Sequence, residues 1–142
     1  MVLDRASTLM QKINFPVFFD PNGVLTVFDG TGKIGVPFPI ARIFTVVADG
    51  GSIRGKHAHY RCSQLLVCLS GQILVRCFDG MNTEEVQLEG NGQGILIPPG
   101  IWASQEYQKD NSMLMALCDR GYEEEDYIRD YQIFIKYKSG DI

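Results

Sequence analysis

Short runs of β-branched and aromatic residues, separated by turns rich in Gly, Pro, Asn and Asp, occupy most of this 142-residue chain. The runs favour strands, and the turn residues supply the backbone conformations that tight reversals need. Strands at this spacing are typical of a β-sandwich or barrel. We therefore predict an all-β fold, with strands near residues 13–19, 24–28, 41–48, 53–60, 63–69, 72–78, 84–88, 94–97, 101–107 and 113–118.

Helix is expected only near the two ends of the chain, and the N-terminal part also carries a hairpin signal. Asn22-Gly23 is a strong signal for a tight turn, so the first two runs should form an N-terminal hairpin. Residues 5–12 are consistent with one weak turn of helix. Near the C-terminus, an aromatic stripe at i, i+4 and i+7 predicts a short helix followed by an extended tail, with the stripe packed against the barrel. The stripe is Tyr127, Tyr131 and Phe134.

Composition limits the class of protein. We expect residues 1–142 to form a single domain, because 45% hydrophobic and 21% charged residues are ordinary for a globular protein. A net charge of −4 argues against nucleic acid or an anionic membrane as the main partner. The chain shows neither a signal peptide nor an apolar stretch long enough to span a membrane. Reduced thiols in a cytoplasm are expected for the four cysteines, Cys62, Cys68, Cys77 and Cys118.

The only two histidines, His57 and His59, lie one residue apart in a strand-like run. Side chains two residues apart on a strand point to the same face, so both imidazoles should face one space. A neutral imidazole with an ordinary pKa of about 6.5 can take up and return a proton near neutral pH. An isolated pair of this kind is more often structural than catalytic, so the flanking pattern decides its meaning.

Two spaced motifs surround the pair. The pattern G-x5-H-x-H-x4-Q-x6-G runs from Gly51 to Gly71 and resembles the first motif of the cupins, in which the place of Gln64 usually belongs to a metal-binding glutamate. The second cupin motif begins at Gly92, but Ala103 takes the place of its histidine. The resemblance implies a cupin-type double-sheet β-barrel, or jelly roll. With two of four ligand places lost, we expect no stoichiometric metal.

Further motifs narrow the resemblance. The segments 37–42 (P-F-x-I-x-R), 54–59 (R-G-x-H-A-H), 78–80 (F-D-G) and 121–131 (GYEEEDYIRDY) are similar to those of the dTDP-4-keto-6-deoxyhexose 3,4-ketoisomerases. These are cupin enzymes of unusual-sugar biosynthesis, which supply lipopolysaccharide O-antigens and S-layer glycans. The resemblance implies transfer of the keto group from C4 to C3 of a dTDP-linked 4-keto-6-deoxyhexose without a cofactor. It also implies a cytoplasmic homodimer with exchanged N-terminal strands.

Roles for individual residues follow from this resemblance. His59 is the candidate base, and His57 would hydrogen-bond the sugar oxygens or relay the proton. Candidate donors to the enediolate are Gln64, Arg54 and Tyr60. Arginine forks suit a diphosphate. The arginines considered are Arg42, Arg54, Arg61, Arg76, Arg120 and Arg129.

Two further interpretations concern residues outside the histidine motif. The lone Trp102 is either a wall of the sugar pocket or a core aromatic. The acidic run Glu123–Asp126 is interpreted as a solvated first turn of the C-terminal helix rather than an acid/base cluster.

Two departures from the family pattern leave other functions open. Asn22 stands where family members usually have arginine, and Ala103 stands where they often have histidine or another large polar residue. Both places are expected to border the sugar pocket. One alternative is a metal-free cupin epimerase acting on a dTDP-sugar, which needs a tyrosine across the pocket from His59. The other is a non-catalytic cupin that binds a sugar nucleotide.

Overall fold

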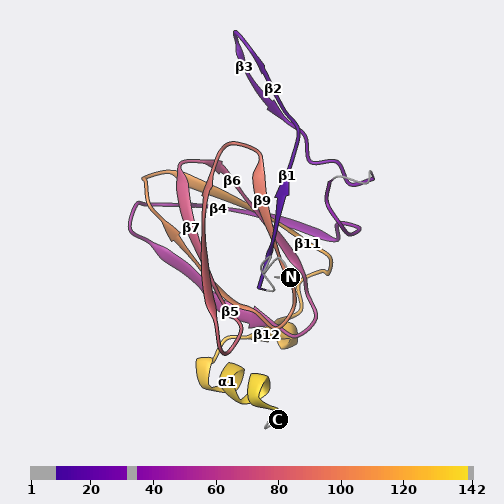
Figure 1. Ribbon diagram of the computed structural model, residues 1–142, viewed down its shortest axis with the longest axis vertical. Helices are drawn as coiled ribbons and strands as arrows, with labels where there is room; N and C mark the ends of the chain where they lie inside the picture. Colours follow the sequence, from indigo (N-terminus) through magenta and orange to yellow (C-terminus); the bar gives the residue numbers. More distant parts are fainter. Residues whose placement is uncertain (1–8, 32–34, 141–142) are drawn as a thin grey trace, which may run out of the picture.

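Two five-stranded antiparallel sheets face each other in the computed structural model, which describes residues 9–31 and 35–140 (Figure 1). In order across the first sheet lie β1 (Gln11–Asn14), β9 (Gln93–Ile97), β6 (Gln64–Ser70), β11 (Ser112–Cys118) and β4 (Arg42–Ala48). Across the second lie β12 (Tyr127–Ile128), β5 (Ile53–His59), β10 (Trp102–Tyr107), β7 (Gln72–Phe78) and β8 (Thr83–Glu89). The prediction of an all-β cupin-type barrel is confirmed.

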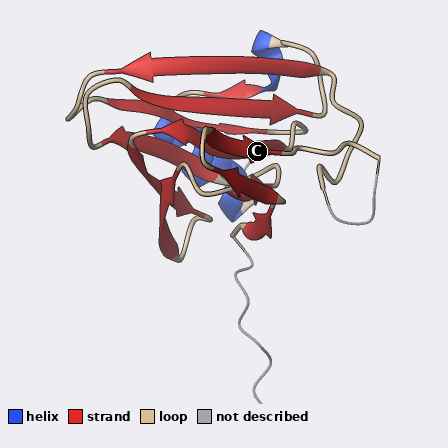
Figure 2. Cartoon of the chain, turned by 90° about the horizontal axis from the view of Figure 1, so that it is seen from above, coloured by secondary structure: helices blue, strands red, loops and turns tan. Residues whose placement is uncertain are grey.

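The core lies between the two sheets because alternate residues of each strand point inward. On β7, for example, Ile73, Val75 and Cys77 are each 0% exposed, whereas the residues between them are half-buried. Burial of such apolar side chains is the main term that stabilises a sandwich. Figure 2 shows how strands make up most of the described chain, with only short helical segments. Among the described residues, no helix has the length and apolar character needed to cross a membrane.

The N-terminal segment forms two strands where the sequence predicted one run. β1 pairs with β9 in the barrel, while β2 (Val17–Asp20) and β3 (Gly23–Thr26) form the predicted hairpin. The break falls at Phe15-Pro16, because proline has no N–H to continue a ladder. The prediction of a helical turn over residues 5–12 is wrong for Gln11 and Lys12, because these two residues belong to strand β1. Residues 5–8 lie outside the described residues.

The C-terminal segment also differs from its prediction. Tyr127 lies in β12 and pairs with His59 of β5, so the helix does not begin there. Instead α1 spans Tyr131–Ser139, because the Asp130 side chain caps its first turn by accepting hydrogen bonds from the next amides. Gly140, at φ 83°, ends it in the left-handed conformation. The extended tail predicted beyond the helix falls at residues 141–142, outside the described residues.

An aromatic cluster joins α1 to the outer face of the second sheet. Phe134 is fully buried against Phe78 and Trp102, with ring centroids 6.1 and 5.5 Å away. Ala58 and Ile128 complete the cluster from the strands beneath. The helix therefore covers the back of β5, the strand that carries both histidines.

Replacing Phe134 with alanine should lower the free energy of unfolding by about 3–5 kcal/mol, because it removes the largest buried side chain of this cluster. Urea denaturation followed by circular dichroism measures the change. The matched control is Ile133→Ala on the same helix, at a residue 45% exposed, with an expected change of about 0.5 kcal/mol or less. Equal losses in the two variants would contradict this account of the outer layer.

Candidate active site

A β-bulge in β5 sets which side chains face the barrel interior. Gly55 and Lys56 both have positive φ, 86° and 60°, and the β5–β10 register shifts at this point. Because the bulge inserts one extra residue, Arg54 and His57 both line the interior, although a regular strand would put them on opposite faces. A Cβ on Gly55 would lie 2.6 Å from Gln105 Oε1, so the position needs glycine for space as well as for its backbone angle.

A cavity of about 250 Å³ lies between the inner faces of the sheets. Its apolar wall comes mainly from the first sheet, and its polar wall mainly from the second. The apolar residues are Phe44, Val46, Leu66 and Leu114. The polar residues are Arg54, His57, Gln64, Gln105, Tyr107, Tyr127 and Arg129. One polar side above a hydrophobic floor is the usual composition of a small-molecule site.

The two histidines lie close together, with His57 on the wall of this cavity. Their ring centroids are 5.1 Å apart and their planes nearly perpendicular, at 89°. His57 lines the cavity, whereas His59 is 5% exposed and lies against the Tyr127 ring, at a centroid distance of 4.3 Å. Among the described residues, His59 Nε2 and His57 Nδ1 have no hydrogen-bond partner.

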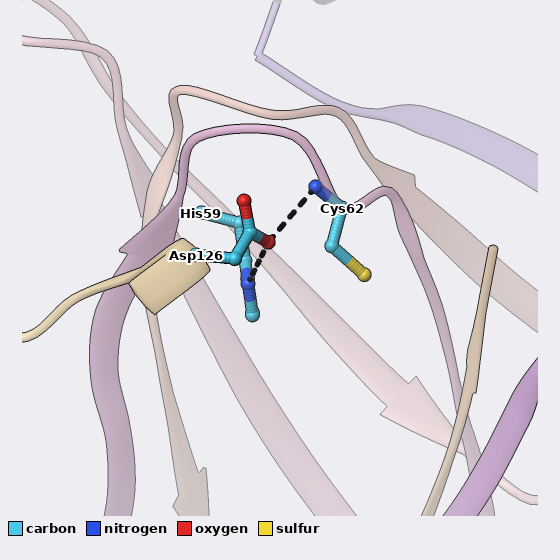
Figure 3. A group of neighbouring side chains, drawn as sticks. All are labelled: His59, Cys62 and Asp126. Carbon is cyan, nitrogen blue, oxygen red and sulfur yellow. Dashed lines mark hydrogen bonds and ion pairs between the residues drawn. The ribbon is translucent and has the colours of Figure 1, made fainter. Parts of the chain in front are cut away.

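A buried carboxylate holds the other nitrogen of His59. Asp126 Oδ2 lies 3.0 Å from His59 Nδ1 and accepts the backbone N–H of Cys62 at 3.1 Å (Figure 3). Its Oδ1 accepts the N–H of Arg61 at 2.7 Å. Asp126 is only 2% exposed, so the interpretation of Glu123–Asp126 as a wholly solvated turn is wrong for this residue. Sequence reasoning missed it because no spacing rule links two positions 67 residues apart.

His59, Cys62 and Asp126 together also offer three atoms that could hold a metal, all within 4.8 Å of one another. Their hydrogen bonds do not suit a metal site. The Asp126 oxygens already accept bonds from the protein, and Nδ1 of His59 is used against Oδ2. A hydrogen bond with Cys118, together with burial, raises the pKa of the Cys62 thiol, whereas a metal ligand must be a thiolate.

Burial favours the neutral form of both imidazoles. Burial is the largest cause and lowers the pKa of His57 from 6.5 to about 4, with the neighbouring His59 acting in the same direction. Burial also lowers the pKa of His59, although the hydrogen bond to Asp126 opposes this. Neutral imidazoles can accept protons, so the arrangement suits general acid/base chemistry.

Arg42 and Gln64 meet at a buried sulfur beside the cavity. Arg42 Nη2 and Gln64 Nε2 each lie 3.6 Å from Cys118 Sγ. The Arg42 guanidinium also lies over the rings of Phe44 and Tyr122, 5.6 Å from each centroid. The structure thus brings Arg42, Gln64 and Arg54 to the same interior as the histidines.

Three other predicted site residues lie on outer faces of the barrel, outside the lining of this cavity. Tyr60 packs edge-on against Tyr137, Trp102 packs against α1, and Arg76 is bound to Glu106 at 3.1 Å. The reason is the two-residue period of a strand, because each of the three is the immediate neighbour of an inward-facing residue. Trp102 is therefore an aromatic of the outer cluster rather than a wall of the pocket.

The two departures from the family pattern have different positions. Ala103 is buried and pairs directly with His57 across β10 and β5, although it is not among the residues that line the cavity. Asn22 lies in the turn of the β2–β3 hairpin, which projects from one end of the barrel (Figure 1). It does not border the cavity of its own chain.

The fold and the site define a cupin-type barrel with a buried, carboxylate-held histidine pair beside an interior cavity. A family model described as FdtA, WxcM-like, C-terminal, matches residues 8–139. The chain belongs to this family.

The chain is similar to several sugar-nucleotide 3,4-ketoisomerases. TDP-4-oxo-6-deoxy-alpha-D-glucose-3,4-oxoisomerase of Aneurinibacillus thermoaerophilus is 34% identical over 126 residues, or 88% of this chain and 89% of that protein. A mutant of the 3,4-ketoisomerase QdtA from Thermoanaerobacterium thermosaccharolyticum, solved with TDP-4-keto-6-deoxyglucose, gives a TM-score of 0.87 at 28% identity, covering 94% and 96% of the two chains. A 3,4-ketoisomerase from Helicobacter canadensis gives 0.85 at 27% identity, covering 92% and 97%.

Proton NMR of the two histidine rings should show His57 titrating near pH 4, well below the ordinary 6.5. Because the folded state binds this proton less tightly than the unfolded chain, the free energy of unfolding should fall as the pH drops from about 6.5 toward 4. Replacing His57 with glutamine should flatten that dependence. A His57 resonance that titrates near 6.5 would show that the ring is not desolvated as described.

Proposed function

We propose that the chain is a sugar-nucleotide 3,4-ketoisomerase, which converts a TDP-4-keto-6-deoxyhexose to the TDP-3-keto-6-deoxyhexose through an enediol, with histidine acid/base catalysis. The family and the activities named for its relatives support the reaction. The observation that carries the catalytic part is the buried histidine pair beside the cavity, with His59 Nε2 free of any described partner.

In this mechanism His59 takes the proton from C3 of the sugar. The electrons of the C3–H bond form the C3=C4 double bond, and the charge moves onto the oxygen at C4, which is then protonated to give the enediol. The second half reverses the step on the neighbouring carbon, since C4 receives a proton while the oxygen at C3 loses one and becomes the carbonyl. His57, on the cavity wall, relays protons between the two oxygens.

Substrate binding is proposed for Arg54, Arg42 and Gln64. Arg54 lines the cavity and makes no ion pair with any described residue, so its charge is available for a diphosphate. Arg129 also lines the cavity, but Glu124 already binds its guanidinium at 2.7 and 3.0 Å. Arg42 keeps a buried Nε without a described partner, which suits a donor to the enediolate.

The alternative activities have less support. An epimerase needs a proton donor across the sugar from His59, but Tyr127 pairs with His59 on the adjacent strand and its ring lies beside the imidazole, tilted by 56°. The rmlC epimerase of Mycobacterium tuberculosis resembles the chain with a TM-score of 0.73 at 17% identity, which shows the fold alone. A cupin that binds a sugar nucleotide without catalysing a reaction would not need an imidazole with one nitrogen unpartnered and the other held by a buried carboxylate.

Replacing His59 with asparagine should lower keto transfer by about 10²- to 10⁴-fold, because an amide cannot accept and release a proton near neutral pH. Incubation with TDP-4-keto-6-deoxyglucose followed by NMR of the product measures the rate. Calorimetric titration with TDP should give nearly unchanged affinity, since the diphosphate contacts are proposed to lie on arginines.

Deuterium exchange tests the same step independently. In heavy water the unchanged enzyme should incorporate deuterium at the sugar carbons, and His59→Asn should not. An asparagine variant that exchanges C3 as fast as the unchanged enzyme would exclude His59 as the base, and His57→Asn would then be measured in the same way.

We also propose that the chain acts as a homodimer with exchanged N-terminal strands, as one cupin domain over residues 1–142, in the cytoplasm. The exposed hairpin supports the dimer, because Phe18, Phe19, Val24 and Leu25 are 58%, 77%, 57% and 60% exposed. Apolar side chains gathered on a projecting hairpin favour burial against a second copy. The four cysteines are buried and free, as a reducing compartment permits.

Light scattering should give twice the chain mass, and the double variant Phe19→Ser, Leu25→Ser should shift the equilibrium toward the monomer by removing apolar contact area. Met81→Ser is the matched control, because this residue is 87% exposed on a turn far from the hairpin in sequence. A monomer mass that does not change with concentration would contradict the proposed assembly.

A further inference from the structure

We infer that Asp126 is a positioning residue for the reaction: it holds the proton of His59 on Nδ1, so that Nε2 keeps its lone pair and is the basic atom. This inference rests on the proposed function and deepens it. Asp126 is not expected to touch the sugar, because it is 2% exposed and lies behind the imidazole.

The backbone at Asp126 is held by its own turn and by the residues that follow β5. Its carbonyl accepts the N–H of Tyr60 at 2.9 Å, and its own N–H donates to Glu123 at 3.0 Å. Immediately afterwards β12 pairs with β5, with Ile128 opposite Ala58. The carboxylate is therefore held at a set distance from the ring that it contacts.

Every group that faces the carboxylate at hydrogen-bond distance is a donor or can act as one. The backbone N–H groups of Arg61 and Cys62 occupy one oxygen each, the Arg61 Nε lies 3.5 Å from Oδ1, and His59 Nδ1 lies 3.0 Å from Oδ2. Burial by itself opposes ionisation of Asp126, but the hydrogen bonds from His59, Arg61 and Cys62 outweigh it and lower the pKa. The group is therefore an ionised acceptor.

An ionised carboxylate can only accept, so the nitrogen facing it must carry the proton. A neutral imidazole has one proton on its ring nitrogens, which leaves Nε2 as the acceptor. This is the nitrogen that has no described partner. Without the carboxylate the ring could adopt the other tautomer, whose protonated Nε2 cannot take a proton from the sugar.

The test is Asp126→Asn, which is nearly isosteric but offers an N–H₂ group in place of one acceptor oxygen. We expect kcat to fall by about 10²- to 10⁴-fold while the affinity for TDP stays within about twofold, the pattern of a lost tautomer at a catalytic histidine. The matched control is Glu123→Gln on the same turn, a half-buried acid paired with Arg120, which should leave kcat unchanged.

Nitrogen-15 NMR separates a positioning role from a merely structural one. In the unchanged protein the His59 ring should show the proton on Nδ1, and in Asp126→Asn it should show a shift toward Nε2. If the unchanged protein carries the proton on Nε2, the inference is overturned, and this reading does not depend on the variant folding or on any activity.

A double-mutant cycle completes the design. If Asp126 acts through His59, adding Asp126→Asn to His59→Asn should cost no further activity, whereas independent effects would multiply and overturn the inference. An unchanged enzyme that does not turn over TDP-4-keto-6-deoxyglucose overturns the proposed function instead. An active enzyme whose Asp126→Asn variant keeps full kcat overturns only the positioning role.

Discussion

The hydrogen bond between His59 Nδ1 and Asp126 joins two residues that are 67 positions apart in the sequence. The orientation of the catalytic candidate His59 depends on it. It requires β12 to pair with β5, because only that pairing delivers the carboxylate behind the ring. It also requires α1, whose Phe134 fills the outer face of the same strands. A sheet edge and a covering helix therefore act together to orient one imidazole.

The bulge at Gly55 and Lys56 makes a second contribution, at an energetic cost. A non-glycine residue at φ 60° is strained by about 1–3 kcal/mol, which the surrounding ladder must offset. Because the bulge shifts the alternation of side chains by one residue, Arg54 points into the interior together with His57. A cationic group and an imidazole then share one wall, which a regular strand of this sequence could not achieve.

Periodicity explains both what could be predicted from the sequence and what could not. Turn residues and apolar runs predicted the strands, and the two-residue period correctly put His57 and His59 on one face. The same period excludes Tyr60 and Trp102 from the cavity, because each directly adjoins an inward residue. Asp126 could not be found this way, since Glu124 and Glu125 directly before it are exposed acids, and its burial follows from tertiary pairing alone.

The place of Gln64 shows how the site can stabilise negative charge with groups of its own. Where cupins usually have a glutamate, this amide donates to Cys118 Sγ, which also accepts from Arg42. Hydrogen bonds from Cys62, Gln64 and Arg42 lower the pKa of Cys118 to about 6 against the opposing effect of burial. A glutamate here would set an acceptor against an acceptor sulfur. Gln64 and Arg42 therefore converge on one sulfur, and Arg42 Nε keeps no partner among the described residues.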